Sequence, residues 1–327
     1  MHLIEEQGRT SIDRFWEFYP ELDITQYELS ALQLERELAG ADLVLAHEWN
    51  DPELIWKLGI YRRSHRQMRL LFHDTHHRAV SNPQAMAAYD LSEYDGVLDF
   101  GSVIRALYLQ RRWCRHAWTW HEAADTTVFQ PKTAERLDGE LAWIGNWGDG
   151  ERTEELHRYL LKPVAELGLS AQVHGVRDPH SARQALAKRG IRHAGWLPNY
   201  DVPTVFSRFR VTIHVPRRQC ARSLPGIPTI RPFETLACGI PLVSAPWENR
   251  EHLFTPGQDY LVARNSREMS SQLRNLLEDP GTANSIAAHG QRTIQDRHTC
   301  AHRANELLRI CEDLELPLNM QLSSLAS

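Results

Sequence analysis

The chain contains few cysteines and no closely spaced pair of them. Its five cysteines are scattered and form no CxxC motif: Cys114, Cys220, Cys238, Cys300 and Cys311. This scatter is typical of reduced thiols in a reducing compartment. No apolar run approaches the roughly 20 residues needed to cross a bilayer, and the polar start MHLIEEQGRTSIDRF does not resemble a signal peptide. We therefore expect a cytoplasmic protein without a transmembrane segment.

The chain also lacks a strong charge of either sign. Its 327 residues carry a net charge of −5, which gives no reason to expect nucleic acid as a partner. Residues 1–137 hold 15 Lys and Arg against 21 Asp and Glu, whereas residues 138–327 hold 22 against 21. The second half is therefore the better host for an anionic ligand.

Short apolar runs alternate with helical patterns along the whole chain. Ten such runs are predicted strands: 42–47, 68–73, 96–100, 116–120, 141–145, 171–175, 191–195, 211–215, 240–245 and 260–264. Continuous apolar strands between helices are typical of parallel sheets that are covered on both faces. The pattern predicts an α/β protein with two Rossmann-like domains facing a cleft. We expect an N-terminal domain over 1–137, a C-terminal domain over 138–312 and a tail over 313–327.

Polar stretches follow several of these strands, where ligands of parallel sheets bind. They include HDTHH after 68–73, GNWGDGERT after 141–145 and PRRQCARSLPG after 211–215. Polar loops also stand at such places in proteins without a ligand. Their position alone makes these stretches candidates for ligand binding, but it does not show that they bind a ligand.

The stretch RPFETLACGIPLVSAP, residues 231–246, predicts a short helix, a glycine stop and a buried strand. Pro232 suits the first helical position and Gly239 the position just past the end, so we expect a helix over 232–238. Glu234 then falls in the first turn. One interpretation is local, because an acid there favours the helix dipole or caps the helix.

The arginines ahead of this helix suggest a second interpretation. Residues 202–233 contain no Asp or Glu but six arginines: Arg208, Arg210, Arg217, Arg218, Arg222 and Arg231. Arginines before a helix N-terminus favour a phosphate or diphosphate. A carboxylate is suited to accept hydrogen bonds from a sugar diol. Together these residues suggest a nucleotide-diphosphate sugar, with a solvated basic face as the alternative.

Two further groups of residues lie after predicted strands of the second half. Glycines in GNWGDGERT permit close approach of a phosphate, which makes Gly145, Asn146 and Arg152 candidate ligand-binding residues. An ordinary strand-to-helix turn explains the same loop. His214 ends the predicted strand 211–215, where it is either a core residue or a neighbour of the ligand.

In the first half, HDTHHR places His73, Asp74 and His76 at the end of a strand. Three interpretations are open: a metal site, catalysis or binding on the acceptor side, and a polar loop with a helix cap at Asp74. The metal interpretation is the least favoured, because ligands in one extended loop rarely converge. We therefore expect no metal site.

The motif around Glu234 resembles the donor-side signature of group-1-type GT-B glycosyltransferases. The closer match is the spore-maturation CgeB-like branch, through Arg231, Phe233, Glu234, Ala237, Cys238, Gly239, Pro256 and Gly257. HEAADTTVFQP (121–131) is similar to the interdomain segment of the family, IGNWGDGERTEEL to the start of its donor domain, and RHTCAHRANELL (297–308) to its closing helix. The resemblance covers roughly residues 40–312.

This resemblance implies transfer of a sugar from a nucleotide-diphosphate sugar with retention at the anomeric carbon, without a metal or other cofactor. The acceptor stays open among glycans, lipids and proteins. The implied donor-binding residues are Gly145, Asn146, Arg152, His214, Arg217, Arg218, Arg231, Phe233 and Glu234. The implied catalytic residues are His73, Asp74 and His76, which face the transfer site, together with Glu234.

The chain departs from the family pattern at two places. Many relatives carry a second acid eight residues before the one that matches Glu234, and here Gly226 stands there. A GT-B N-terminal domain usually opens with a strand and a glycine-rich turn, whereas the first strand predicted here starts near Asp42, so we expect a shortened N-terminal domain. Alternatives are a non-catalytic nucleotide-sugar or glycan-binding module, a nucleotide-sugar epimerase, and a metallo-hydrolase built on HDTHH.

Overall fold

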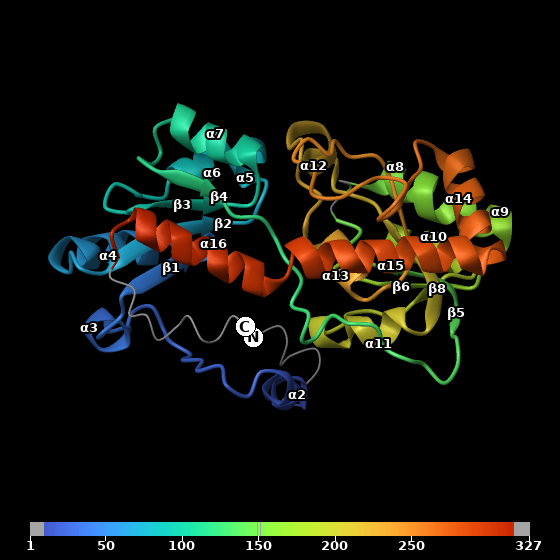
Figure 1. Ribbon diagram of the computed structural model, residues 1–327, viewed down its shortest axis with the longest axis horizontal. Helices are drawn as coiled ribbons and strands as arrows, with labels where there is room; N and C mark the ends of the chain where they lie inside the picture. Colours follow the sequence, from blue (N-terminus) through green and yellow to red (C-terminus); the bar gives the residue numbers. More distant parts are fainter. Residues whose placement is uncertain (1–9, 149, 151, 317–327) are drawn as a thin grey trace.

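The computed structural model describes residues 10–148, 150 and 152–316. Its strands form two parallel sheets that lie in two lobes (Figure 1). All ten predicted strands are present, and each end lies within two residues of its prediction. The predicted α/β class with two Rossmann-like parallel-sheet domains is therefore confirmed.

The N-terminal lobe is built on a four-stranded sheet in the order β1-β2-β3-β4. These strands are β1 (Leu43–His47), β2 (Arg69–Asp74), β3 (Gly96–Asp99) and β4 (Ala117–Thr119). One face of the sheet packs against α4 (Pro52–Ser64), α5 (Arg78–Ser81), α6 (Pro83–Ala87) and α7 (Ser102–Gln110). Between Thr10 and β1 the structure has α2 (Thr10–Phe18) and α3 (Leu34–Glu37) and no strand.

The C-terminal lobe is built on a six-stranded sheet in the order β10-β9-β8-β5-β6-β7. Its strands are β5 (Gly139–Ile144), β6 (Ala171–His174), β7 (Arg192–His193), β8 (Phe209–His214), β9 (Leu242–Ser244) and β10 (Leu261–Val262). The first and fourth strands of the lobe, β5 and β8, are neighbours. The chain runs outward from this pair in both directions, so the pair marks the switch point at which ligands of open parallel sheets bind.

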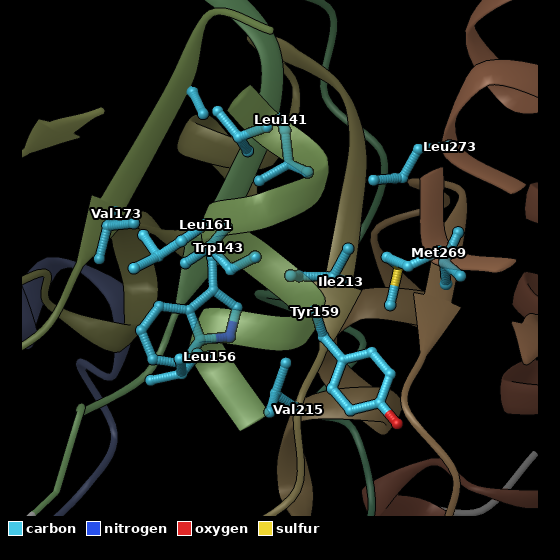
Figure 2. Close-up of a cluster of buried hydrophobic side chains, with 14 of the residues drawn as sticks. Leu141, Trp143, Leu156, Tyr159, Leu161, Val173, Ile213, Val215, Met269 and Leu273 are labelled. Carbon is cyan, nitrogen blue, oxygen red and sulfur yellow. The ribbon is translucent and has the colours of Figure 1, made fainter. Parts of the chain in front are cut away.

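Helices cover both faces of this sheet, which explains why most of the buried positions in its strands are apolar. One face carries α8 (Thr153–Leu156), the π-helical turn η1 (His157–Leu161), α9 (Lys162–Leu167), α10 (His180–Ala187) and α14 (Ser266–Glu278). The other carries α11 (Val202–Phe206), α13 (Ile230–Ala237) and α15 (Pro280–Arg297). Figure 2 shows the first core, in which Trp143 of β5 and Ile213 of β8 meet Leu156 and Met269 from the helices.

The two lobes are joined by packing as well as by the chain. The segment after β8 contains α12 (Arg218–Ser223), and its Cys220, Leu224 and Ile227 lie in the apolar core of the N-terminal lobe. A Cβ atom on Gly101 would lie 2.3 Å from Ile227, so only glycine permits this approach. Glu251 of the C-terminal lobe accepts hydrogen bonds from the Ser102 amide at 2.8 Å and from its hydroxyl at 2.9 Å.

Both ends of the described chain cross to the lobe at the other end of the sequence. The helix α16 (Cys300–Asp313) lies along the free face of the N-terminal sheet (Figure 1) and packs Ile310 on Leu71 and Leu98. The helix α2 lies against the C-terminal lobe, where Arg14 pairs with Asp201. None of the helices in the described ranges has the length and apolar character needed to span a membrane.

Candidate functional site

A cavity of about 300 Å³ lies at the switch point of the C-terminal sheet. Three segments line it: Trp143–Asn146 with Arg152, Ile213–Arg217, and Thr229–Arg231. Two of these segments end the neighbouring strands β5 and β8, and the third begins α13. The topology therefore brings together stretches that are up to 88 residues apart in sequence (143 to 231).

Gly145 and Arg152 shape one wall of this cavity. Arg152 donates from Nη1 to the carbonyl oxygen of Val215 at 3.0 Å and lies over the ring of Trp143. A Cβ atom on Gly145 would lie 3.0 Å from the Trp143 ring, so glycine permits the close approach of the backbone to this ring. Asn146 accepts from the amide of Val176 at 3.1 Å and ties the loop to the end of β6.

The start of α13 forms a second wall and differs from the prediction. The helix begins at Ile230, two residues earlier than expected, because Pro232 is tolerated anywhere in a first turn whose amides have no helical acceptor. Glu234 is then the fifth helical residue, and the first turn contains no acid. The interpretation of Glu234 as a first-turn cap is therefore wrong. Thr229 before the helix has φ 67°, a strained value for a β-branched residue, at the edge of the cavity.

Glu234 itself does not line the cavity and is only 2% exposed. Its Oε2 atom lies 2.6 Å from Nη1 of Arg231, which does line the cavity. Its Oε1 atom accepts a hydrogen bond from Asn199 Nδ2 at 2.8 Å. Burial raises the pKa of this carboxyl, while Arg231 and Asn199 oppose the rise. Glu234 therefore acts on the cavity by holding Arg231 in place.

His214 and Phe233 differ in their relation to the cavity. His214 lines it, is buried, and contacts Ser244 Oγ through Nδ1 at 2.9 Å. Burial, and after it the charges of Arg152 and Arg231, lower the pKa of His214 to about 3, so the ring is neutral at pH 7. Phe233 does not line the cavity and is buried among apolar side chains, edge-on to Phe254, where it anchors α13 to the core.

The adjacent residues Arg217 and Arg218 are separated by the beginning of α12. Arg217 precedes the helix and lines the cavity. Arg218 is the first helical residue, and its guanidinium donates two hydrogen bonds of 3.0 Å to the carboxylate of Glu155 on α8. The structure therefore brings Arg152, Arg217 and Arg231 together and directs Arg218 away from them.

The N-terminal lobe contributes histidines from the end of β2. His73 packs edge-on against His47 and Trp120, and burial followed by the charge of His47 lowers its pKa to about 4. His76 packs edge-on against Trp49, and its pKa is also lowered to about 4, mainly by burial. The charge of Arg217 contributes to this shift. His76 therefore lies within electrostatic range of Arg217, which lines the cavity of the C-terminal lobe.

Asp74 lies beneath this loop and is fully buried. One carboxylate oxygen accepts from the amide of His76 at 3.0 Å and the other from the hydroxyl of Tyr108 at 2.9 Å. Burial raises the pKa of Asp74 to about 7. Its geometry is that of a positioning residue. Among the described residues, no three His, Cys, Asp or Glu side chains are arranged to hold a metal ion.

Two acids near the site were missed by the sequence analysis. Glu48 follows β1, is fully buried, and binds the Thr75 hydroxyl at 2.9 Å and Arg78 at 3.0 Å. Glu122 lies on the segment that joins the lobes. Burial, followed by the charges of Glu234 and Glu48, raises its pKa to about 7. The signal for Glu48 was its place directly after a predicted strand.

Comparison with known proteins gives one family and many structures of the same fold. A family model described as glycosyl transferase-like matches residues 152–309, which include Arg152, Arg217, Arg231 and Glu234. A comparison with curated protein sequences finds no significant match. The matched segment covers most of the C-terminal lobe.

Three solved structures illustrate the likeness of fold. Sucrose-phosphate synthase from Thermosynechococcus elongatus is 15% identical, with a TM-score of 0.62 over 86% of this chain and 76% of that chain. The Anabaena protein HepE in complex with UDP is 13% identical, with a TM-score of 0.62 over 86% and 81%. A glycosyltransferase from Rickettsia africae is 9% identical, with a TM-score of 0.56 over 94% and 88%. These likenesses show that the chain has the GT-B fold.

Proposed function

We propose that this protein is a glycosyltransferase whose donor is a nucleoside-diphosphate sugar. The observation that carries the proposal is the cavity at the switch point, where Arg152, Arg217 and Arg231 meet the start of α13. Guanidinium groups and first-turn amides both bind diphosphate well. The glycosyl transferase-like match includes Arg152 and the Ile213–Arg217 and Thr229–Arg231 segments of this cavity, but not Trp143–Asn146. The complexes of HepE with UDP and with UDP-glucose support a uridine nucleotide as the first candidate.

The chemistry requires stabilisation of a leaving diphosphate. The bond between the anomeric carbon and a diphosphate oxygen breaks, and the oxygen keeps the electron pair. The acceptor hydroxyl bonds to the anomeric carbon and gives its proton to the leaving diphosphate. We propose that Arg152, Arg217 and Arg231 offset the developing charge in place of a divalent metal ion. We also propose retention of configuration at the anomeric carbon.

His73 and His76 of the N-terminal lobe are suited to bind uncharged groups, such as the hydroxyls of the sugar or the acceptor. Because the pKa values of His73 and His76 are lowered to about 4, both rings are uncharged at pH 7 and can bind hydroxyl groups without repelling the arginines. We propose that they contact the transferred sugar or the acceptor hydroxyl, with Asp74 positioning the loop.

Glu234 is assigned to positioning in this proposal. Its carboxylate lies between Arg231 and Asn199, so it orients the guanidinium toward the diphosphate. The motif from Arg231 to Gly239 also supports placement of the chain in the CgeB-like branch.

A ligand screen followed by product analysis tests the proposal. Thermal shift against UDP-, GDP-, ADP- and dTDP-sugars is expected to give stabilisation by one nucleotide class. Incubation with that donor and a panel of glycan, lipid and protein acceptors is expected to give a glycoside whose anomeric configuration is the same as that of the donor. The rate of transfer is expected to be unchanged when EDTA is added. Binding without transfer would instead indicate a binding module. A new sugar isomer formed without acceptor would indicate an epimerase.

A conservative substitution tests the assignment of Glu234. We expect Glu234→Gln to reduce kcat/KM by roughly 10- to 100-fold, because the charged partner that orients Arg231 is lost. Glu248→Gln is the matched control, since Glu248 pairs with Arg250 at the exposed surface. Equal rates in the two variants would contradict the role of Glu234.

A further inference from the structure

A second cavity, of about 490 Å³, lies between the N-terminal segment and the C-terminal lobe. One wall comes from α2 and the residues that follow it, and the other from Trp196 and Pro198–Tyr200. The first wall contributes mainly apolar side chains: Ile12, Phe15, Trp16, Tyr19, Leu22 and Ile24. The arginine cavity draws none of its lining from this segment.

Specific contacts hold α2 in this place. The guanidinium of Arg14 donates two hydrogen bonds to Asp201, at 2.9 and 2.5 Å, and lies over the ring of Tyr200. Phe18 stacks on Tyr200 with ring centroids 4.8 Å apart. Tyr19 donates from its hydroxyl to Asp125 at 3.2 Å. Figure 1 shows α2 beside α11, away from the sheet of the N-terminal lobe.

The lining of this cavity favours an uncharged, flat group. Its aromatic walls offer ring faces for stacking, and its size falls in the range of small-molecule sites. The helix and the residues after it carry four exposed acids: Asp13, Glu17, Glu21 and Asp23. These acids repel a phosphate, so the anionic end of a ligand belongs in the arginine cavity.

Glu234 links the two cavities. One carboxylate oxygen contacts Arg231, which lines the arginine cavity, and the other accepts from Asn199, which lines the second. Glu234 is buried and lines neither cavity, and it lies between the cationic cavity and the aromatic cavity. A nucleoside diphosphate presents a diphosphate, a ribose diol and a flat base in the same order.

We propose that α2 and the residues after it, up to Gln26, form the outer wall of the nucleoside pocket, and that the base of the donor is held between this wall and the Trp196–Tyr200 loop. The inference rests on the proposed function and adds a part from the opposite end of the chain to the donor site. It makes the N-terminal segment the determinant of which base is accepted, with Trp16 as the ring at the open side of the cavity.

Comparing a ligand that has a base with one that has none distinguishes binding at the aromatic cavity from binding at the arginine cavity. The full chain is titrated calorimetrically with UDP and with inorganic pyrophosphate. We expect Trp16→Ala to weaken UDP binding by about tenfold, the upper end for one aromatic contact, and to leave pyrophosphate binding unchanged. Trp56→Ala is the matched control, because Trp56 is an exposed tryptophan (48% against 36% for Trp16) on α4 of the other lobe.

The outcomes distinguish this inference from the proposed function. Unchanged UDP affinity in Trp16→Ala, or a loss of pyrophosphate affinity to the same extent as UDP, overturns the inference alone. A wild-type chain that binds neither UDP nor another nucleoside diphosphate overturns both. Hydrogen exchange in the wild type is a second measurement that needs no variant. UDP, but not pyrophosphate, is expected to slow exchange over residues 12–26, and equal exchange with both ligands contradicts the inference.

Discussion

The two sheets share one architecture and differ in the charge at their carboxyl ends. The C-terminal sheet gathers Arg152, Arg217 and Arg231 around its cavity. The N-terminal sheet places His73 and His76 at the corresponding edge, with the pKa of both rings lowered by burial. The carboxyl ends of the strands therefore carry cationic side chains in the C-terminal sheet and uncharged histidines in the N-terminal sheet. Parallel strands supply the place for a ligand, and the side chains that follow them decide its charge.

Buried acids accompany both edges and have different partners. Glu234 in the C-terminal lobe is paired with a cation. Asp74 in the N-terminal lobe accepts only from a hydroxyl and an amide, and burial raises its pKa to about 7. The first acid holds an arginine that faces the ligand cavity. The second holds a loop whose histidines are neutral.

Breaking the pair between Arg231 and Glu234 is the most severe test of this comparison. We expect Arg231→Met to lower the free energy of unfolding by about 3–5 kcal/mol, because it leaves a buried carboxylate without its cation. Urea denaturation measures this change. Adding Glu234→Leu to Arg231→Met is expected to restore most of the loss. Arg250→Met, which breaks an exposed pair, is expected to change stability by less than about 1 kcal/mol.

A loss of the same size in Arg250→Met would show that the burial of the Arg231 pair is not what matters. Failure of the double variant to recover stability would show that the carboxylate is not left unpaired in Arg231→Met. Either result would remove the distinction between Glu234, which pairs with a cation, and Asp74, which accepts from a hydroxyl and an amide.

Arg217 and Arg218 provide a second test, which concerns the arginines around the cavity of the C-terminal sheet. We expect Arg217→Ala to weaken UDP binding by roughly 10- to 100-fold, because a charged group that faces the cavity is removed. Arg218→Ala is expected to stay within about twofold of the wild type, since its guanidinium is bound to Glu155. Calorimetric titration measures both. Equal losses would indicate a nonspecific basic face.

The pH dependence of stability tests the edge of the N-terminal sheet at which Asp74 is buried. The pKa of Asp74 is about 7 in the folded chain against an ordinary value of 3.8, so folding favours the protonated form. Its contribution to stability is complete below about pH 4 and is lost as the pH rises through 7. We expect the wild type to lose about 3–4 kcal/mol over this range relative to Asp74→Asn, because each unit of pKa difference corresponds to about 1.4 kcal/mol. A difference that stays constant between pH 4 and pH 7 would contradict the raised pKa.

The sequence alone predicted the strands of both sheets and several of the loops that follow them. Alternation of apolar runs and helical patterns predicted all ten strands, since strands covered on both faces are rich in apolar residues. It also nominated the loops after β2, β5 and β8. It misplaced the start of α13 because Pro232 is compatible with any position of a first turn.

The sequence did not predict which of the candidate residues line the cavity and which contact other parts of the protein. Arg217 and Arg218 are adjacent and chemically identical, and only the start of α12 sends one to the cavity and the other to Glu155. Phe233 shares a motif with Glu234 yet packs into the core. Glu48 was missed because its partners Thr75 and Arg78 contact it from the loop after β2 and from the start of α5.

What could be inferred from the order of residues is what depends on near neighbours: strand and helix periods, helix stops, and loops after strands. What required the folded chain is what depends on distant partners. The bond between Arg14 and Asp201 joins residues 187 positions apart. The contact of Glu234 with Asn199 depends on α13 meeting the 196–200 loop. Local patterns are set by backbone geometry, whereas burial and charge pairing arise only when separate elements pack together.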